Sequence, residues 1–175
     1  FSRMAFVSDG VLTPVPCMQD FKYAYDGDRG LMTGGMGSYS TADGGLPFLT
    51  TRDYKQADRL LKETVHALED ETGTRYRGFL YGQFMAANDG VRVIEYNVRL
   101  GDPEALNLMS LLDTPPAELF YAIASGDLAP KKVTLKHQAS VSKYLVPQSY
   151  PESIPQPIEF QFDPDLVKKN GLTLI

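Results

Sequence analysis

The sequence has little cysteine, little histidine and no large excess of charge, and each shortage excludes a class of protein. One cysteine, Cys17, and two histidines, His66 and His137, cannot build a disulfide scaffold, a Cys/His zinc cluster or a haem-attachment motif. No apolar run approaches the ~20 residues that a membrane helix needs. The 22 acidic and 17 basic side chains give a net charge of −5, which argues against a broad nucleic-acid-binding surface.

The remaining composition is typical of a folded globular protein. Hydrophobic side chains make up 43% of the 175 residues and charged ones 22%, which is enough for one or two packed domains and atypical of disorder. The chain opens on the apolar run FSRMAFVS without an initiator methionine, and this run lacks the charged region of a signal peptide. It closes on the similar run GLTLI. We interpret the chain as a segment of a longer protein in preference to one with trimmed termini.

The pattern of apolar residues and turn signals predicts two hairpins and a long helix. Asp-Gly pairs separate residues 4–7 from 11–17 and residues 79–87 from 91–100, and such pairs favour tight hairpins. Helical spacing of apolar residues follows Thr51, the predicted N-cap, and Gly73 is expected to end that helix.

The second half of the chain adds two shorter helices. Asp102, Pro103 and Glu104 predict a helix start with a capping carboxylate, and Pro115-Pro116 separates it from a helix that ends at Gly126. Residues 133–146 alternate like a strand. The predicted class is α+β with mainly antiparallel strands, and the predicted domains are residues 1–130 and 131–175.

The strand VRVIEYNVRL carries the clearest chemistry. Strict alternation places Glu95, Asn97 and Arg99 on one face with Val91 and Val93. A carboxylate and an amide oxygen are ligands that Mg²⁺ accepts, while phosphates and waters supply the rest. Arg99 could clamp a phosphoryl or carboxylate group. The alternative is a strand whose polar face only meets solvent. A two-residue turn at Asp89-Gly90 would set Glu95 opposite Phe84 and Asn97 opposite Gly82, so neither neighbour would be a ligand.

A glycine-rich segment is the second candidate. Residues 19–47 show little apolar periodicity, which predicts a long loop of functional type. Within it, Gly34, Gly35 and Gly37 could bring backbone N–H groups close to an anion because no Cβ obstructs the approach. A simple turn is the alternative, and the segment lacks the G-K-[ST] of a P-loop. The helix start after Arg99 would point its N-terminus at the same site.

His66, His137 and Cys17 are not expected to take part in catalysis. His66 lies beside the apolar stripe of its helix, and His137 lies in the strand-like segment. Cys17 has no basic neighbour in sequence that would lower its pKa, so it is predicted to be a small buried hydrophobic residue.

Several motifs together resemble the glycinamide ribonucleotide synthetase family of the ATP-grasp superfamily. The match rests on DGDRGLMTGGMGSYS (26–40), GFLY (78–81) and EYNVRLGDPE (95–104), with FS at the start, QDFK (19–22) and SYP (149–151) in the same order. It extends over about residues 1–150. The pair TGGMG and EYNVRLGDPE is specific, whereas E-x-N alone recurs across ATP-grasp enzymes.

The resemblance implies the second half of an ATP-grasp domain and the start of a small β-rich C-terminal domain. It implies a cytoplasmic ligase of purine biosynthesis that joins glycine to 5-phosphoribosylamine with ATP, through a glycyl phosphate. Glu95 and Asn97 are expected to hold Mg²⁺ or Mn²⁺, and Arg99 to stabilise the reacting phosphoryl or carboxylate group. The residues implied to bind glycine or the ribose phosphate are Thr33, Gly34, Gly35, Met36, Gly37, Asp102 and Pro103.

The resemblance is incomplete in composition and in length. Phe21 stands where the family usually has histidine, and Leu31-Met32 where it often has Pro-Asn. The family's N-terminal domain and ATP-covering lobe would precede Phe1, so the isolated chain is expected to be inactive and to need the missing half of the same protein. The alternatives are another ATP-grasp carboxylate–amine ligase and a non-catalytic relative. No nucleic acid or membrane is expected as a partner.

Overall fold

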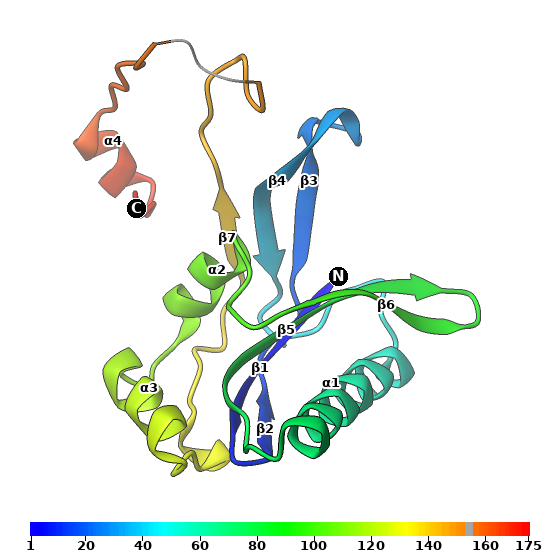
Figure 1. The fold of residues 1–175 in the computed structure, drawn as a ribbon. Coiled ribbons are helices and arrows are strands. Elements are labelled where there is room, and N and C mark those ends of the chain that lie inside the picture. Colours follow the sequence, from blue (N-terminus) through cyan, green and yellow to red (C-terminus); the bar gives the residue numbers. More distant parts are fainter. Residues whose placement is uncertain (153–155) are drawn as a thin grey trace. The chain divides into compact units, whose positions relative to one another are not determined.

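Two hydrophobic clusters, one on each face of a single sheet, form the core of the N-terminal part of the chain. The structure is a computed structural model that describes residues 1–152 and 156–175. In the central strand, Met4 and Phe6 belong to one buried cluster, and Ala5 and Val7 belong to another on the opposite face. The four-stranded antiparallel sheet has the order β2-β1-β5-β6 (Figure 1). Its strands are β1 (Ser2–Ser8), β2 (Val11–Pro14), β5 (Arg77–Ala87) and β6 (Gly90–Asn97).

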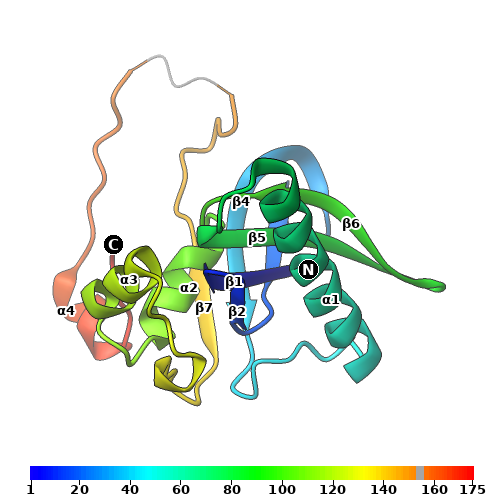
Figure 2. The ribbon, with the colours of Figure 1, turned by 60° about the horizontal axis from the view of Figure 1, so that its bottom comes forward.

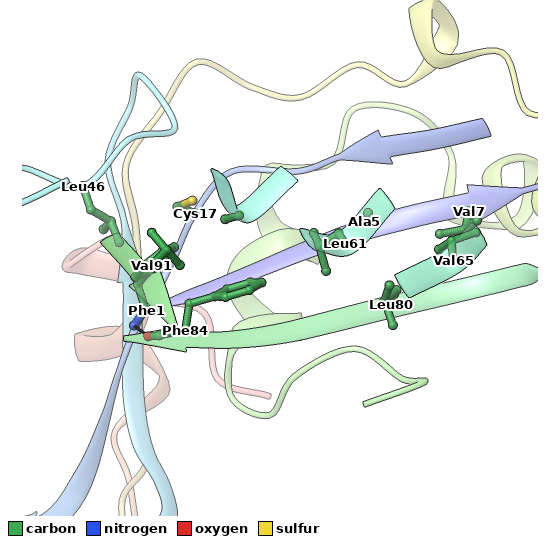
Figure 3. Close-up of a cluster of buried hydrophobic side chains, with 11 residues drawn as sticks. Phe1, Ala5, Val7, Cys17, Leu46, Leu61, Val65, Leu80, Phe84 and Val91 are labelled. Atoms are coloured by element: carbon green, nitrogen blue, oxygen red, sulfur yellow. Dashed lines mark hydrogen bonds between the residues drawn. The ribbon is translucent and has the colours of Figure 1, made fainter. Parts of the chain in front are cut away.

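Helices cover the two faces of this sheet. On one face α1 (Thr51–Thr72) buries Ala57, Leu61 and Val65 against β1 and β5. Figure 2 shows α1 beside the sheet, and Figure 3 shows Leu61 and Val65 within this cluster. On the other face the second cluster includes residues of α2 (Glu104–Leu111) and α3 (Pro116–Ser125). Cys17 is buried in the α1 cluster, as predicted. No helix in the described residues is long and apolar enough to cross a membrane.

The predicted loop at residues 19–47 is wrong over most of its length. β3 (Gln19–Tyr25) and β4 (Arg29–Ser40) form a hairpin there, and β7 (Ser140–Lys143) pairs with β4 to complete a second sheet of order β3-β4-β7. Asp28 and Gly27 adopt positive φ at the hairpin turn. The expectation failed because glycines accept extended backbone as readily as turns, while their missing side chains erase the alternation that identifies a strand.

The other predicted elements form, with shifted ends. The hairpins at Asp9-Gly10 and around Asp89 are present, and β6 ends at Asn97 rather than Leu100. α3 ends at Gly126 with the predicted left-handed cap, and Gly73 caps α1 in the same way. The strand predicted at residues 133–146 is confined to β7, preceded by a 3-10 turn at Pro130–Lys132.

The start of α1 is one residue earlier than predicted. Thr50, not Thr51, is the N-cap: its Oγ1 accepts from the Asp53 backbone N–H, and the Asp53 carboxylate accepts from the Thr50 N–H at 2.8 Å. This reciprocal pair is a capping box. We expect Thr50→Ala to cost about 1 kcal/mol of stability, because the Asp53 backbone N–H loses its partner. Thr51→Ala is the matched control, and it should change the melting temperature far less. Equal losses for both variants would refute the assignment of the cap.

The chain divides into two units, Phe1–Tyr144 and Leu145–Ile175. The described residues of the second unit contain one short helix, α4 (Pro164–Lys169), whose N-cap Asp163 accepts from the backbone N–H groups of Asp165 and Leu166. Residues 153–155 of the predicted second domain lie outside the described residues. The predicted boundary at residue 130 concerns domains of a longer protein and stays a prediction.

Candidate functional site

A β-bulge at Ile94 decides which side chains meet at the candidate site. Phe84 pairs with Val93, but Gln83 pairs with Glu95, so one extra residue of β6 separates the two pairs. A bulge of this kind reverses the alternation of faces beyond it. Val91 therefore packs in the α1 core, whereas Glu95 lies on the face of Gln83.

Two sequence expectations are wrong for that reason. Glu95 and Asn97 do not share a face with Val91 and Val93, and their cross-strand neighbours are Gln83 and Tyr81 rather than Phe84 and Gly82. The polar face they form is opposite to α1, because Phe84 and Tyr96 pack together on the α1 side. The sequence contains no glycine or proline at Ile94 to signal the bulge.

The Glu95–Asn97 pair is the centre of this face. The Asn97 Nδ2 group donates to Glu95 Oε1 at 3.2 Å, which turns the amide oxygen of Asn97 away from the carboxylate. Glu95 is exposed and Asn97 is half-buried. Gln83, which the sequence analysis missed, adds a third oxygen-bearing side chain directly across from Glu95.

The donor set suits a hard divalent cation that keeps open positions. One carboxylate and two amides offer oxygen ligands only, and Mg²⁺ commonly takes one or two carboxylates and completes its shell with waters and phosphates. No cluster of three His, Cys, Asp or Glu side chains that could hold a metal occurs among the described residues. The residues present therefore fit a cation that a phosphate ligand helps to hold, not an all-protein metal cage.

Arg99 lies just beyond the end of β6 and is exposed. Its guanidinium donates to the Leu100 carbonyl at 3.0 Å. Among the described residues, no hydrogen bond or ion pair joins Arg99 to Glu95 or Asn97. The sequence predicted three polar side chains in a row on one strand face. Only Glu95 and Asn97 lie on the strand, and Arg99 lies on the segment that follows it.

The glycine-rich strand contacts this following segment. A Cβ at Gly35 would lie 2.8 Å from Pro103 Cδ and 3.1 Å from the Asp102 carbonyl oxygen, so the strand backbone approaches closely only because Gly35 has no side chain. Gly34 has open space on the same strand. The structure therefore brings Gly35, Asp102 and Pro103 together, three of the residues that the resemblance assigns to substrate.

The pairing of β3 with β4 is irregular where these glycines lie. Phe21 pairs with Gly37 and Tyr23 with Met32, so several residues of β4 face a single residue of β3. Thr33 stabilises the irregular stretch: its Oγ1 donates to the Lys22 carbonyl at 2.8 Å and accepts from the Gly35 N–H at 3.1 Å. The Met36 carbonyl accepts from the Tyr144 N–H. These hydrogen bonds restrain Thr33–Gly37, a segment for which the sequence analysis predicted a loop.

The predicted capping role of Asp102 is wrong. The N-cap of α2 is Pro103, which makes no side-chain cap, and the Asp102 carboxylate instead accepts from the Tyr144 hydroxyl. One turn into α2, the buried Asn107 side chain bonds to Ser38, Ser140 and Ser142, and so joins α2 to β4 and β7. These hydrogen bonds position the sheet of β3, β4 and β7 beside the segment that carries Asp102 and Pro103.

A buried acid lies beneath the polar face. Glu104 is 1% exposed, and its Oε1 lies 3.0 Å from the Tyr81 hydroxyl, which is also 3.3 Å from Gln83 Oε1. Burial, then the nearby Asp20 carboxylate, raises the pKa of Glu104. Burial likewise raises the pKa of Tyr81. Sequence reasoning treated Glu104 only as an acid in the first turn of a helix.

One pocket of the described residues lies away from this site. It has a volume of about 420 Å³ and is lined by α1 and the first hairpin, without any predicted site residue. Its lining residues are Gly10, Leu12, Lys55, Asp58, Arg59 and Lys62.

Comparisons with known proteins were made on sequence and on structure. Residues 1–105 match the family described as phosphoribosylglycinamide synthetase, ATP-grasp (A) domain. The chain is 46% identical over 172 residues to phosphoribosylamine–glycine ligase of Methanothermobacter thermautotrophicus, covering 98% of this chain and 39% of that protein. It is 41% identical over 175 residues to the ligase of the same name from Pyrococcus horikoshii, covering 100% of this chain and again 39% of that protein.

Solved structures agree with this similarity. The chain superposes on phosphoribosylamine–glycine ligase from Thermotoga maritima with a TM-score of 0.69 and 32% identity, covering 86% of this chain and 37% of that one. The ATPase subunit of phosphoribosylaminoimidazole carboxylase from Aquifex aeolicus gives a TM-score of 0.53 at 17% identity, covering 88% and 42%, a likeness of fold alone. The chain therefore spans about two fifths of the length of these relatives.

Proposed function

This chain belongs to the phosphoribosylglycinamide synthetase family through its ATP-grasp (A) domain, and from that premise we propose that it is part of an ATP-dependent phosphoribosylamine–glycine ligase. In structural terms it is the second half of the ATP-grasp domain followed by the start of a small C-terminal domain. The observation that carries the proposal is the Glu95–Asn97 pair on the polar face of β6, inside the matched residues.

The reaction proceeds in two transfers. A glycine carboxylate oxygen attacks the γ-phosphorus of ATP, the bond to the β–γ bridging oxygen breaks, and glycyl phosphate and ADP form. The amine of 5-phosphoribosylamine then attacks the glycyl carbonyl carbon. Phosphate leaves, the nitrogen loses a proton, and glycinamide ribonucleotide is the product. Both transfers place negative charge on phosphoryl oxygens, and stabilising such charge is the main task of the protein in phosphoryl transfer.

Three groups of residues are suited to three different tasks, namely binding the metal ion, pairing with an anionic group and binding the substrate. Glu95 and Asn97, with Gln83 across the sheet, would hold Mg²⁺ or Mn²⁺ through oxygen atoms, and the bound ion would neutralise charge on the ATP phosphates. Arg99 on the following segment is suited to pair with a phosphoryl oxygen or the glycine carboxylate. Thr33–Gly37, with Asp102 and Pro103, would bind glycine or the ribose phosphate through backbone groups.

Substrate dependence tests the proposal in the full-length protein that contains this chain. Phosphate release from Mg²⁺·ATP should require both glycine and 5-phosphoribosylamine, and glycinamide ribonucleotide should accumulate one to one with ADP. Phosphate release with a different carboxylate and amine, but not with glycine, would favour another ATP-grasp ligase. ATP binding without release under any of these conditions would instead favour a non-catalytic relative, for which Phe21 in place of histidine is the specific support.

A further inference from the structure

The Tyr81 hydroxyl lies within hydrogen-bond distance of two oxygen atoms but carries only one hydrogen. It lies 3.0 Å from Glu104 Oε1 and 3.3 Å from Gln83 Oε1, and both distances suit hydrogen bonds. A tyrosine carries one O–H donor, while an amide oxygen and an ionised carboxylate only accept. With Gln83 Oε1 directed at Tyr81 as it is here, an ionised Glu104 would leave one of these two close contacts without a hydrogen between its oxygen atoms.

We propose that Glu104 is held as the neutral carboxylic acid and donates its proton to Tyr81, which donates in turn to Gln83. Each contact then contains one hydrogen, and the direction of donation runs from the buried acid toward the polar face. Tyr81 pairs across the sheet with Asn97, and Gln83 with Glu95. The chain of donors therefore ends on the side chain opposite Glu95, and it fixes which way the Gln83 amide turns.

The surroundings of Glu104 favour the uncharged form. The side chain is 1% exposed, and its other oxygen, Oε2, would lie only 2.4 Å from a Cβ at Gly101, so the carboxyl group packs closely against the backbone there. No cation forms an ion pair with Glu104 among the described residues. An unpaired carboxylate in such a place is costly, and proteins commonly avoid the cost by keeping the proton.

Groups on the neighbouring elements both raise and lower the pKa of Glu104. The buried carboxylate of Asp20 on β3 faces Glu104, and its own ion pair with Lys22, at 2.8 Å, only partly offsets its charge. The hydroxyl groups of Tyr81 and Ser2 act in the opposite direction, because donation to the carboxylate lowers the pKa of Glu104. Burial and Asp20 together raise the pKa of Glu104, in agreement with the hydrogen count.

The consequence for the metal rests on the proposed function. Groups that orient metal ligands without touching the ion typically change metal affinity 10- to 100-fold when they are removed. Tyr81 is such a positioning residue for Gln83, and Glu104 is one for Tyr81. Neither is offered as a catalytic residue.

Protonation of Glu104 is tested by stability, independently of catalysis. A raised native pKa means that the folded state keeps this proton to higher pH than the unfolded state does, so the stability of the parent protein falls relative to Glu104→Gln as pH rises above the unfolded value. We expect the two melting temperatures to converge near pH 4. At pH 8 Glu104→Gln should melt higher by roughly 3 °C or more. An infrared band of a protonated carboxyl group at pH 7 should be absent from the variant.

The opposite proton arrangement predicts the opposite result. There the Gln83 amide nitrogen donates to Tyr81, and Tyr81 donates to an ionised Glu104. A parent protein that is more stable than Glu104→Gln at pH 8, with the advantage shrinking as pH falls, would overturn the proposal. So would the absence of the infrared band.

Kinetics of the full-length ligase tests the positioning role. Glu104→Gln retains an N–H donor and should leave the apparent KM for Mg²⁺ within about twofold, whereas Tyr81→Phe should raise it roughly tenfold with the KM for glycine unchanged. Tyr76→Phe is the matched control, because the Tyr76 hydroxyl donates to the Phe79 carbonyl within its own strand region. If Glu95→Gln abolishes Mg²⁺·ATP use while Tyr81→Phe behaves as Tyr76→Phe does, this inference fails and the proposed function stands. If Glu95→Gln is also silent, the proposed metal site fails.

Discussion

In the full-length ligase, Glu95→Gln is expected to lower kcat/KM for ATP at limiting Mg²⁺ by roughly a hundredfold or more. Glu95 is the one carboxylate of the polar face formed with Gln83 and Asn97. Its replacement leaves three neutral amides, which keep the size and the oxygen atoms of the site but remove its negative charge. A hard divalent cation loses most of its attraction to such a set. Initial rates over a series of Mg²⁺ concentrations measure the effect.

A second glutamate serves as the matched control for this prediction. Glu63 on α1 is also exposed, and it forms a long i,i+4 pair with Arg59 at 3.7 Å, an arrangement that contributes little. Glu63→Gln should leave the rate and its Mg²⁺ dependence unchanged within about twofold. Because Asn97 can still donate to the oxygen of a glutamine at position 95, the fold of β6 should survive, and circular dichroism checks this. An active Glu95→Gln enzyme with unaltered Mg²⁺ dependence would remove Glu95 from the metal site.

The sequence predicted the pair at the site but not the surface on which it lies. Glu95 and Asn97 are two residues apart on a strand, so their shared face followed from local geometry alone. Their partner Gln83 depended on the bulge at Ile94, which arises from the fit of β6 against β5 and α1. Packing of that kind is a tertiary effect, and one extra residue reverses every assignment beyond it.

The same division between local and tertiary causes explains the other outcomes. Caps and turns at Gly73, Gly126 and Asp9-Gly10 were predictable because a left-handed residue or a tight turn has its own sequence signature. The β3–β4 hairpin was not, because its pairing depends on contacts with β7 and on the Asn107 bonds, from residues about 70 to 100 positions away. Glu104 was missed because its burial, not its residue type, gives it a role.

Gly35→Val is expected to impair the ligase strongly, because Gly35 closely approaches the segment that carries Asp102 and Pro103. The nearest atom to an added Cβ is Pro103 Cδ at 2.8 Å, and the Asp102 carbonyl lies at 3.1 Å, so the branched side chain must push the strand away from this segment. If Thr33–Gly37 binds glycine or the ribose phosphate beside Asp102 and Pro103, the displacement should raise the KM for glycine or 5-phosphoribosylamine roughly tenfold or more. The KM for ATP should change less, because Glu95 and Asn97 lie on another strand.

The adjacent glycine separates this effect from a general intolerance of side chains. Gly34 has no atom within 4 Å of an added Cβ, so Gly34→Val should fold normally and β-branched residues suit an extended strand. The comparison needs melting temperatures and the three KM values for both variants. A Gly35→Val enzyme whose only defect concerns ATP would refute the substrate role of the strand. Equal damage from Gly34→Val would instead point to contact of a substrate with Gly34 itself, since the protein offers no obstruction there.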